Sequence, residues 1–193
     1  MKIEPARILH TQHLLLRYPE LDDAAQILSV VQSAQFPERL PLKELSSKNQ
    51  VEGWLKMLQE GWAAGRVFSW ILENRQSGDV VGQVTLSRLE GENLWSLAFW
   101  IHPDHWDKGY ATEGAERILA FGFEQLGAEK VWAGAGVWNL ASCRVLEKTG
   151  MICVGENPQG YTSKGEPIPT REYEISQERW RKNPRSQGRP AGW

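Results

Sequence analysis

The chain of 193 residues is long enough to form one domain with a hydrophobic core that needs neither disulfides nor a metal for stability. Its 22 Lys and Arg residues against 24 Asp and Glu give a net charge of −2, which argues against a surface built to bind nucleic acid. The longest apolar-rich run, LWSLAFWI at 94–101, is far below the roughly 20 residues that span a bilayer, and the N-terminus lacks the apolar core of a signal peptide, so we expect a cytoplasmic protein that does not enter a membrane.

The first third of the chain predicts one strand followed by two helices. The strand is HLLLRYP at 13–19, and the helix after it has Asp22 or Asp23 as its N-cap and an apolar face of Ala24, Ile27, Leu28 and Val31. The Pro-broken segment FPERLPL at 36–42 follows this helix. A second helix extends from about Ser47 to Gly65, because apolar residues recur at helical spacing at Val51, Trp54, Leu55, Leu58 and Trp62.

The middle of the chain predicts an antiparallel meander and then a crossover. VFSWILEN at 67–74, VVGQVTLS at 80–87 and LWSLAFWI at 94–101 are strand-like runs joined by turns that contain glycine. The helix after them has an apolar face of Ala115, Ile118, Leu119, Gly122 and Leu126. A buried strand, KVWAGAGV at 130–137, and a helix, LASCRVLEKTG at 140–150, come next. A passage of this kind implies a right-handed crossover.

The last part of the chain predicts two strands and a tail. ICVGE at 152–156 and REYEIS at 171–176 alternate like strands, and the Gly- and Pro-rich segment 157–170 lies between them as a loop. The fold class is therefore mixed α/β (α+β), with a partly antiparallel sheet and helices on its faces. We expect the domain to occupy residues 8–177 and the basic segment 178–193 to be a solvated, flexible tail.

Two cysteines and ten tryptophans stand out in the composition. Cys143 and Cys153 are too few for a disulfide framework, and we expect each to be a small buried hydrophobe. Most of the tryptophans should lie in the core, and the remainder can line a binding site.

The segment WDKGYATEG at 106–114 joins the third meander strand to the next helix and has the chemistry of an anion site. Gly109 permits a backbone φ that other residues resist, and Ala111 keeps the surface low. The N–H groups of residues 108–112 would have no intrahelical acceptors, and the helix dipole and Lys108 add positive potential. A phosphate is the group that such a turn favours.

A second segment, NLASCRVLEKTGM at 139–151, places Asn139 as a helix N-cap and Ser142 on the first turn. Together the motifs W-x-K-G-Y-A-T-E and N-x-x-S-x-R-V-L-E-K-x-G-M resemble the GNAT superfamily of N-acetyltransferases. The nearest likeness is to the ribosomal-protein-alanine acetyltransferases of the RimJ/RimL-like branch, over about residues 8–177. This resemblance implies a mixed, mostly antiparallel sheet in which one pair of parallel strands splays apart, with helices on both faces.

The resemblance also implies a binding site for acetyl-CoA between the two splayed strands. The pantetheine arm would pair with Trp100, Ile101 and His102, and Asn139 would hydrogen-bond it. The pyrophosphate would rest on the backbone N–H groups of Lys108, Gly109, Tyr110, Ala111 and Thr112. The activity implied is direct transfer of the acetyl group to a primary amine within a ternary complex, without a metal, and relatives are often homodimers.

The catalytic side chains depart from the common family pattern. Leu146 stands where many relatives have a Tyr as general acid, and the resemblance gives that role to Ser142. Ser96 stands where many have a Glu base, so we expect deprotonation through ordered water with help from Glu156 or Tyr173. Without a strong base the site suits an α-amine, with a pKa of about 7.7–8.0, better than a lysine amine at about 10.4, of which roughly one in 2,500 is neutral at pH 7.

Other functions are compatible with parts of this pattern. The missing Tyr and Glu leave open a non-catalytic acyl-CoA-binding module that presents the basic tail to a ribosome or a nucleic acid, and a third candidate is a small-molecule amine or antibiotic acetylase. GAGVWN at 134–139 begins like a dinucleotide fingerprint but lacks its third glycine. HPDH at 102–105 suggests metal ligands, but no further ligands follow with zinc spacing, so we expect these histidines to cap or pack the loop.

Overall fold

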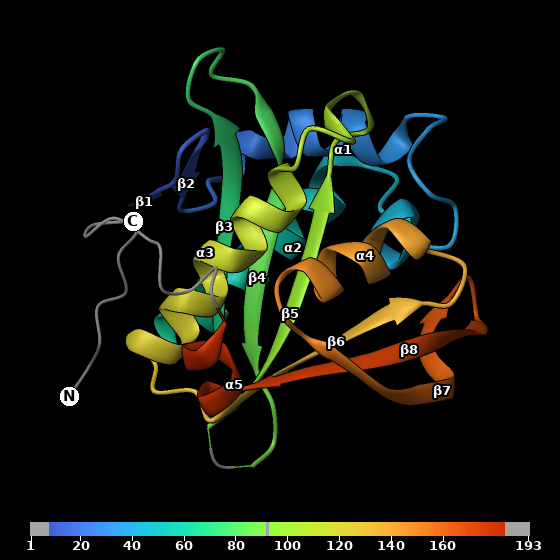
Figure 1. Cartoon of the computed structure of the whole chain (residues 1–193). Coiled ribbons are helices and arrows are strands. Elements are labelled where there is room, and N and C mark those ends of the chain that lie inside the picture. The colour runs from blue at the N-terminus through green and yellow to red at the C-terminus, as the bar shows by residue number, and fades with distance from the viewer. Residues whose placement is uncertain (1–7, 92, 184–193) are drawn as a thin grey trace.

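The structure, a computed structural model, describes residues 8–91 and 93–183, and within them eight strands form a single mixed sheet (Figure 1). The strand order is β1-β2-β3-β4-β5-β6-β8-β7. All neighbouring pairs are antiparallel except β5 and β6, which are parallel. The strands are β1 (Ile8–His10), β2 (Leu14–Arg17), β3 (Val67–Asn74), β4 (Val80–Arg88), β5 (Leu94–Ile101), β6 (Lys130–Gly136), β7 (Ile152–Ser163) and β8 (Glu166–Ser176).

Helices cover both faces of this sheet. α3 and α4 pack on one face, and α1 and α2 pack on the other (Figure 1). The mixed α/β fold expected from the sequence is therefore confirmed, with a mostly antiparallel sheet and one parallel pair. The helices are α1 (Ala24–Gln32), α2 (Lys48–Ala63), α3 (Tyr110–Glu124), α4 (Leu140–Lys148) and α5 (Gln177–Lys182), and short 3-10 turns are η1 (Leu21–Asp23), η2 (Pro41–Glu44) and η3 (Pro103–His105).

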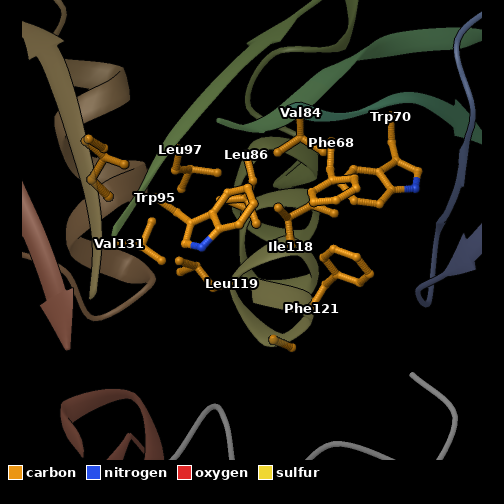
Figure 2. Packing of buried hydrophobic residues seen from close by; sticks show 14 of the residues in the cluster. Phe68, Trp70, Val84, Leu86, Trp95, Leu97, Ile118, Leu119, Phe121 and Val131 are labelled. Carbon is orange, nitrogen blue, oxygen red and sulfur yellow. The ribbon is translucent and has the colours of Figure 1, made fainter. Parts of the chain in front are cut away.

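The larger hydrophobic core lies between α3 and the sheet (Figure 2). Phe68 and Trp70 of β3 contact Phe121 of α3, with ring centroids 5.8 and 5.0 Å from that of Phe121. Trp95 of β5 stacks on Phe68 at 5.6 Å. Buried apolar surface contributes roughly 25 cal/mol per Å², so rings of this size hold α3 firmly against the sheet. The N-terminus of α3 is thereby fixed close to the end of β5.

The beginnings of the first two helices differ in how well the sequence predicted them. Ser47 caps α2 as expected, because its hydroxyl accepts a hydrogen bond from the N–H of Gln50 at 3.3 Å. Asp23 occupies the N-cap of α1, but its carboxylate accepts from Arg17 at 2.6 Å and from the N–H of Glu20 at 2.8 Å. Asp23 therefore stabilises η1 through a reciprocal capping box with Glu20. The prediction that its side chain caps α1 is wrong.

The three-strand meander β3-β4-β5 lies close to its predicted bounds, and both predicted final strands are present, whereas the loop predicted between them is wrong. The segment expected to be a loop is part of one long hairpin, because β7 and β8 both continue into it. The hairpin turns at Lys164 and Gly165, whose φ values of 51° and 79° suit a two-residue type I′ turn. A register shift between Asn157 and Tyr161 accommodates the residues that suggested a loop.

The outer strand and the C-terminal segment bring two further corrections. Residues 152–160 of β7 are exposed at the edge of the sheet, so Cys153 is exposed where we expected burial, while Cys143 on α4 is buried. The segment predicted as a tail begins with α5, which buries Trp180 against Phe123 with ring centroids 5.2 Å apart. The remainder of that segment, 184–193, lies outside the described residues. Among the helices described, none combines the length and the apolar character needed to cross a membrane.

Candidate active site

The sheet opens between β5 and β6, its one parallel pair. The pairing of Cα partners stops at Ser96 and Trp132, and beyond them the two strands diverge (Figure 1). β5 then continues over residues 97–101 and β6 over residues 133–136. We call these two segments and the interval between them the β5–β6 divergence. Strand edges of this kind present N–H and C=O groups that need partners.

The ladder between β4 and β5 decides which peptide groups face the divergence. The N–H of His102 donates to the carbonyl oxygen of Val81 at 2.9 Å. Because an antiparallel ladder alternates, the even-numbered residues of β5 direct their peptide groups to β4. The odd-numbered residues direct theirs to the divergence, and these are Leu97, Phe99 and Ile101. The carbonyl oxygen of Ile101 also accepts from Trp106 Nε1 at 2.9 Å.

This geometry corrects the contacts expected for a pantetheine arm. Of the three predicted residues, only Ile101 faces the divergence. The peptide groups of Trp100 and His102 are turned to β4, and His102 Nδ1 caps η3 by accepting from the N–H of Asp104 at 3.1 Å. The sequence shows that successive residues of the strand alternate in direction. It does not show which of them face β4, because that depends on how β5 pairs with β4. That is why Leu97 and Phe99 were missed.

On the other side of the divergence, β6 presents glycines. The N–H of Val137 donates to the carbonyl oxygen of Pro169 at 3.0 Å, so the odd-numbered residues of β6 pair with β8. Gly134 and Gly136 therefore direct their peptide groups to the divergence. The carbonyl oxygen of Gly136 accepts from the N–H of Asn139 at 2.7 Å, which leads the chain into α4.

The N-terminus of α3 lies open at the end of this region. Gly109 has φ 83° and ψ −3°, which confirms the left-handed conformation that the sequence indicated. A Cβ at Gly109 would meet no atom within 4 Å, so glycine is favoured here by the positive φ and not by a close contact. The N–H of Glu113 donates to the Gly109 carbonyl at 3.0 Å. The N–H groups of the three preceding residues, Tyr110, Ala111 and Thr112, therefore have no acceptors within the helix.

Side chains from distant parts of the chain hold this first turn in place. The Tyr110 hydroxyl accepts from Asn74 Nδ2 at 2.7 Å. The Glu113 carboxylate accepts from the backbone N–H of His13 at 2.7 Å and lies 2.8 Å from Nδ1 of the same residue. These contacts fix the direction of the free N–H groups, which is the geometry that an anion needs.

Basic side chains border the same N-terminus. Lys108 is exposed, and its Nζ lies 3.4 Å from Nδ1 of His105. Burial lowers the pKa of His105, and the charges of Lys108 and His102 lower it further, whereas Asp79 and Asp104 act in the opposite sense. His105 is therefore neutral at neutral pH, and Lys108 supplies the positive charge. In the part of the chain described, no group of three or more His, Cys, Asp and Glu side chains is arranged to hold a metal.

α4 begins beside the divergence and carries the second predicted motif. Asn139 is its N-cap, and the side-chain oxygen accepts from the N–H of Ser142 at 3.1 Å. The side-chain amide nitrogen of Asn139 is the group that could donate to a ligand. Ser142 is partly buried on the first turn of α4, one turn from the end of β6. Both residues therefore lie where the sequence motif indicated.

The two residues expected to assist deprotonation, Glu156 and Tyr173, lie on the β7–β8 hairpin. Tyr173 is 1% exposed in the core beneath α4, and its hydroxyl donates to Glu147 at 3.2 Å. Burial raises the pKa of Tyr173, and the neighbouring Cys143 and Glu147 raise it further, so the hydroxyl keeps its proton at neutral pH. Glu156 is exposed and accepts from Arg171 Nε at 3.2 Å. The geometry therefore argues against either residue as a base at the divergence.

The face of the sheet that α1 and α2 cover carries a chain of polar side chains that we did not predict. Trp100 Nε1 donates to Gln83 at 2.7 Å, and Gln83 Nε2 donates to Ser69 Oγ at 2.6 Å. Ser69 Oγ and Thr85 Oγ1 are 2.8 Å apart. Ser96 lies on the same face, and its hydroxyl donates to a β4 carbonyl at 3.3 Å. The alternation of polar and apolar residues in VGQVTLS was the signal that could have located these positions.

Comparison with known proteins agrees with this geometry. The family model described as "Acetyltransferase (GNAT) domain" matches residues 13–152. An uncharacterized N-acetyltransferase of Bacillus subtilis, YoaA, is 26% identical over 169 residues, which are 87% of this chain and 96% of the relative.

Two solved structures share the fold. One is a putative ribosomal-protein-serine acetyltransferase from Vibrio cholerae, with a TM-score of 0.78 and 21% identity over 89% of this chain and 98% of that one. The other is Mycobacterium smegmatis RimJ in complex with CoA-disulfide, with a TM-score of 0.76 and 20% identity over 86% of this chain and 82% of that one.

Proposed function

Because the chain belongs to the GNAT acetyltransferase family and is an acetyl-CoA-dependent N-acetyltransferase, we propose that its acceptor is the α-amine of a protein or peptide N-terminus. The observation that carries this proposal is the chemistry of β5 beside the divergence. Ser96 of β5 lies on this side, the side chains of Ser69, Gln83 and Thr85 on the neighbouring strands are neutral, and none of these residues is a strong base. An α-amine with a pKa of about 7.7–8.0 is neutral in roughly one molecule in ten at pH 7 and needs the least help to react.

The described residues fit the pyrophosphate and the pantetheine arm of acetyl-CoA. Its pyrophosphate would accept hydrogen bonds from the N–H groups of Tyr110, Ala111 and Thr112, with Lys108 as a countercharge. Its pantetheine arm would lie in the divergence as an extra strand. There the peptide groups of Leu97 and Phe99 face it, which replaces the pairing that we expected from Trp100 and His102.

The proposed chemistry is direct attack in a ternary complex. The neutral amine nitrogen bonds to the thioester carbonyl carbon, the carbon–sulfur bond breaks, and the thiolate leaves. Ser142, on the first turn of α4, gives its proton to that thiolate and regains one from solvent. Free N–H groups along the divergence are the donors available to the carbonyl oxygen as it gains charge.

An acceptor panel with detection of released thiol tests the proposal. The panel contains peptides with a free N-terminus, the same peptides with a blocked N-terminus and one free lysine, spermidine, and small aromatic amines. We expect kcat/KM to be highest for a free α-amine. Faster release with spermidine or a small amine would replace the proposal by a small-molecule acetylase. Binding of acetyl-CoA without release for any amine would support a non-catalytic acyl-CoA-binding module instead.

A further inference from the structure

A carboxylate that no motif identified lies beside the divergence on the face that carries Ser96. Glu172 of β8 pairs with Gly134 of β6, and Gly134 borders the divergence. Neighbouring strands are about 4.8 Å apart, so Glu172 is one strand from the opening, and no side chain on Gly134 separates them. Trp132 occupies the same face two residues before Gly134, because the side chains of a strand alternate between faces.

Glu172 is held in place by a hydrogen bond from a buried hydroxyl. The hydroxyl of Thr170 donates to Glu172 Oε1 at 2.6 Å, and Thr170 itself is only 2% exposed. Among the described residues no ion pair involves Glu172, whereas Glu174, two residues later on the same face, is paired with Lys130 at 2.8 Å. A partly buried carboxylate without a cation favours a cationic ligand.

Two indoles lie on the same face of the sheet as this carboxylate. The Trp132 indole lies over Gly134, since its Cη2 is 2.9 Å from the position that a Cβ there would occupy. The Trp138 indole lies over Gly136 in the same way, with Nε1 at 2.5 Å. The two indoles therefore occupy the space that side chains at Gly134 and Gly136 would need. Indole faces attract ammonium groups.

Two buried polar atoms lie close together at the edge of this cluster. Trp138 Nε1 and the Tyr161 hydroxyl are both shielded from solvent. Burial raises the pKa of Tyr161, whereas the contact with Trp138 and the positive charge of Arg39 lower it. Tyr161 pairs with Ile168 of β8, which lies on the same face as Thr170 and Glu172.

We infer that Glu172 and Trp132 bind the ammonium form of the acceptor, a primary amine on an apolar stem. The inference rests on the proposed function, because it names the acceptor subsite of the same active centre. The carboxylate accepts hydrogen bonds from the ammonium group and the indole face covers its stem. The bound ammonium first gives one proton to Glu172, which releases it to solvent, and the neutral amine then attacks. The surplus proton of the attacked nitrogen leaves by the same route, so the carboxylate is regenerated. Glu172 replaces Glu156 and Tyr173 as the acidic group near the acceptor.

Binding of benzylamine tests this inference without any acetyl transfer. Benzylamine is cationic at neutral pH, and benzyl alcohol is its neutral analogue. Each is titrated into the protein saturated with CoA, which cannot donate an acetyl group, and binding is followed by calorimetry. We expect benzylamine to bind the wild type, and Glu172→Gln to raise its Kd at least about tenfold, because a hydrogen bond to a charged group is lost. The Kd of benzyl alcohol should be equal in both proteins.

Glu174→Gln is the matched control, because it removes the same charge from the same strand and face. It should leave the Kd of benzylamine unchanged, and Trp132→Leu should raise it. Thermal unfolding of each variant shows that it is folded. The inference is overturned if benzylamine does not bind the wild type, if Glu172→Gln binds it equally well, or if both Gln variants weaken it alike.

Turnover separates this inference from the proposed function. With a peptide acceptor, Glu172→Gln should raise KM for the peptide and shift the pH profile of kcat/KM to higher pH, while KM for acetyl-CoA is unchanged. A peptide KM that does not move would contradict the inference and leave N-terminal acetylation intact. Benzylamine binding that depends on Glu172, in a protein that acetylates no peptide, would contradict the proposed acceptor class and leave the subsite intact.

Discussion

Replacing Gly109 by alanine tests the anion site at the N-terminus of α3. The residue has φ 83°, and an added Cβ would meet nothing within 4 Å, so the whole cost of the change is conformational. A left-handed backbone costs a residue with a Cβ about 1–2 kcal/mol. In a chain of this length, that lowers Tm by roughly 2–8 °C. Relaxing the strain would turn the peptide groups that precede the helix.

The same change should weaken the binding of acetyl-CoA. A hydrogen bond to a charged group contributes about 1.5–3 kcal/mol, so displacing one N–H from the pyrophosphate raises Kd by roughly 10- to 150-fold. Gly127→Ala is the matched control, because Gly127 follows the other end of α3 with φ 64° and also has nothing within 4 Å. Calorimetric titration gives Kd and scanning calorimetry gives Tm.

The two variants should lose similar stability, and only Gly109→Ala should lose affinity. If Gly109→Ala binds acetyl-CoA as tightly as the wild type, the N-terminus of α3 is not the pyrophosphate site. If Gly127→Ala weakens binding to the same extent, the loss reports general destabilisation.

Three further predictions concern single side chains. Ser142→Ala should lower kcat by about 100-fold or more without changing Kd for acetyl-CoA, as steady-state kinetics and calorimetry would show; an unchanged kcat would leave Ser142 as a helix residue only. Arg17→Met should lower the free energy of unfolding by about 3 kcal/mol, because it leaves the buried Asp23 carboxylate without its cation, and a loss below about 1 kcal/mol in denaturant titration would contradict this. Burial lowers the pKa of His105, and the phosphates of a bound CoA would raise it. CoA binding near pH 6 should therefore take up protons, and its affinity should increase as pH falls. Calorimetry in two buffers of different ionisation heat measures the proton uptake, which His105→Asn should abolish.

Local patterns predicted most of the fold. The meander was visible because each strand is a short apolar run closed by a glycine-containing turn, and α3 because its apolar residues recur every three or four positions. The hairpin of β7 and β8 was missed because glycine and proline usually mark loops, and the decisive signal was a single Lys164–Gly165 turn. Cys153 was misplaced because nothing local shows that a strand lies at an edge.

The site was predictable only where one segment carries all of its geometry. The left-handed Gly109 and the Asn139 cap are local, and the motif located both. The residues that face the divergence depend on how β5 pairs with β4, and Glu172 depends on how β8 pairs with β6. Pairing of this kind joins positions far apart in the chain, so no window of sequence contains it.

The interrupted pairing of β5 and β6 also bears on how the molecule unfolds. Strands β1–β5 and β6–β8 share only three residue pairs across it, so partial opening between the two halves of the sheet breaks few hydrogen bonds. A ligand that binds only the closed form adds about 2.7 kcal/mol to its stability when present at 100 times its Kd. Resistance to proteolysis should therefore follow the supply of acetyl-CoA, and slower hydrogen exchange at the amides of Leu97 and Phe99 would report it. Because acetyl-CoA stabilises the closed sheet, the enzyme would be degraded most slowly when acetyl-CoA is plentiful.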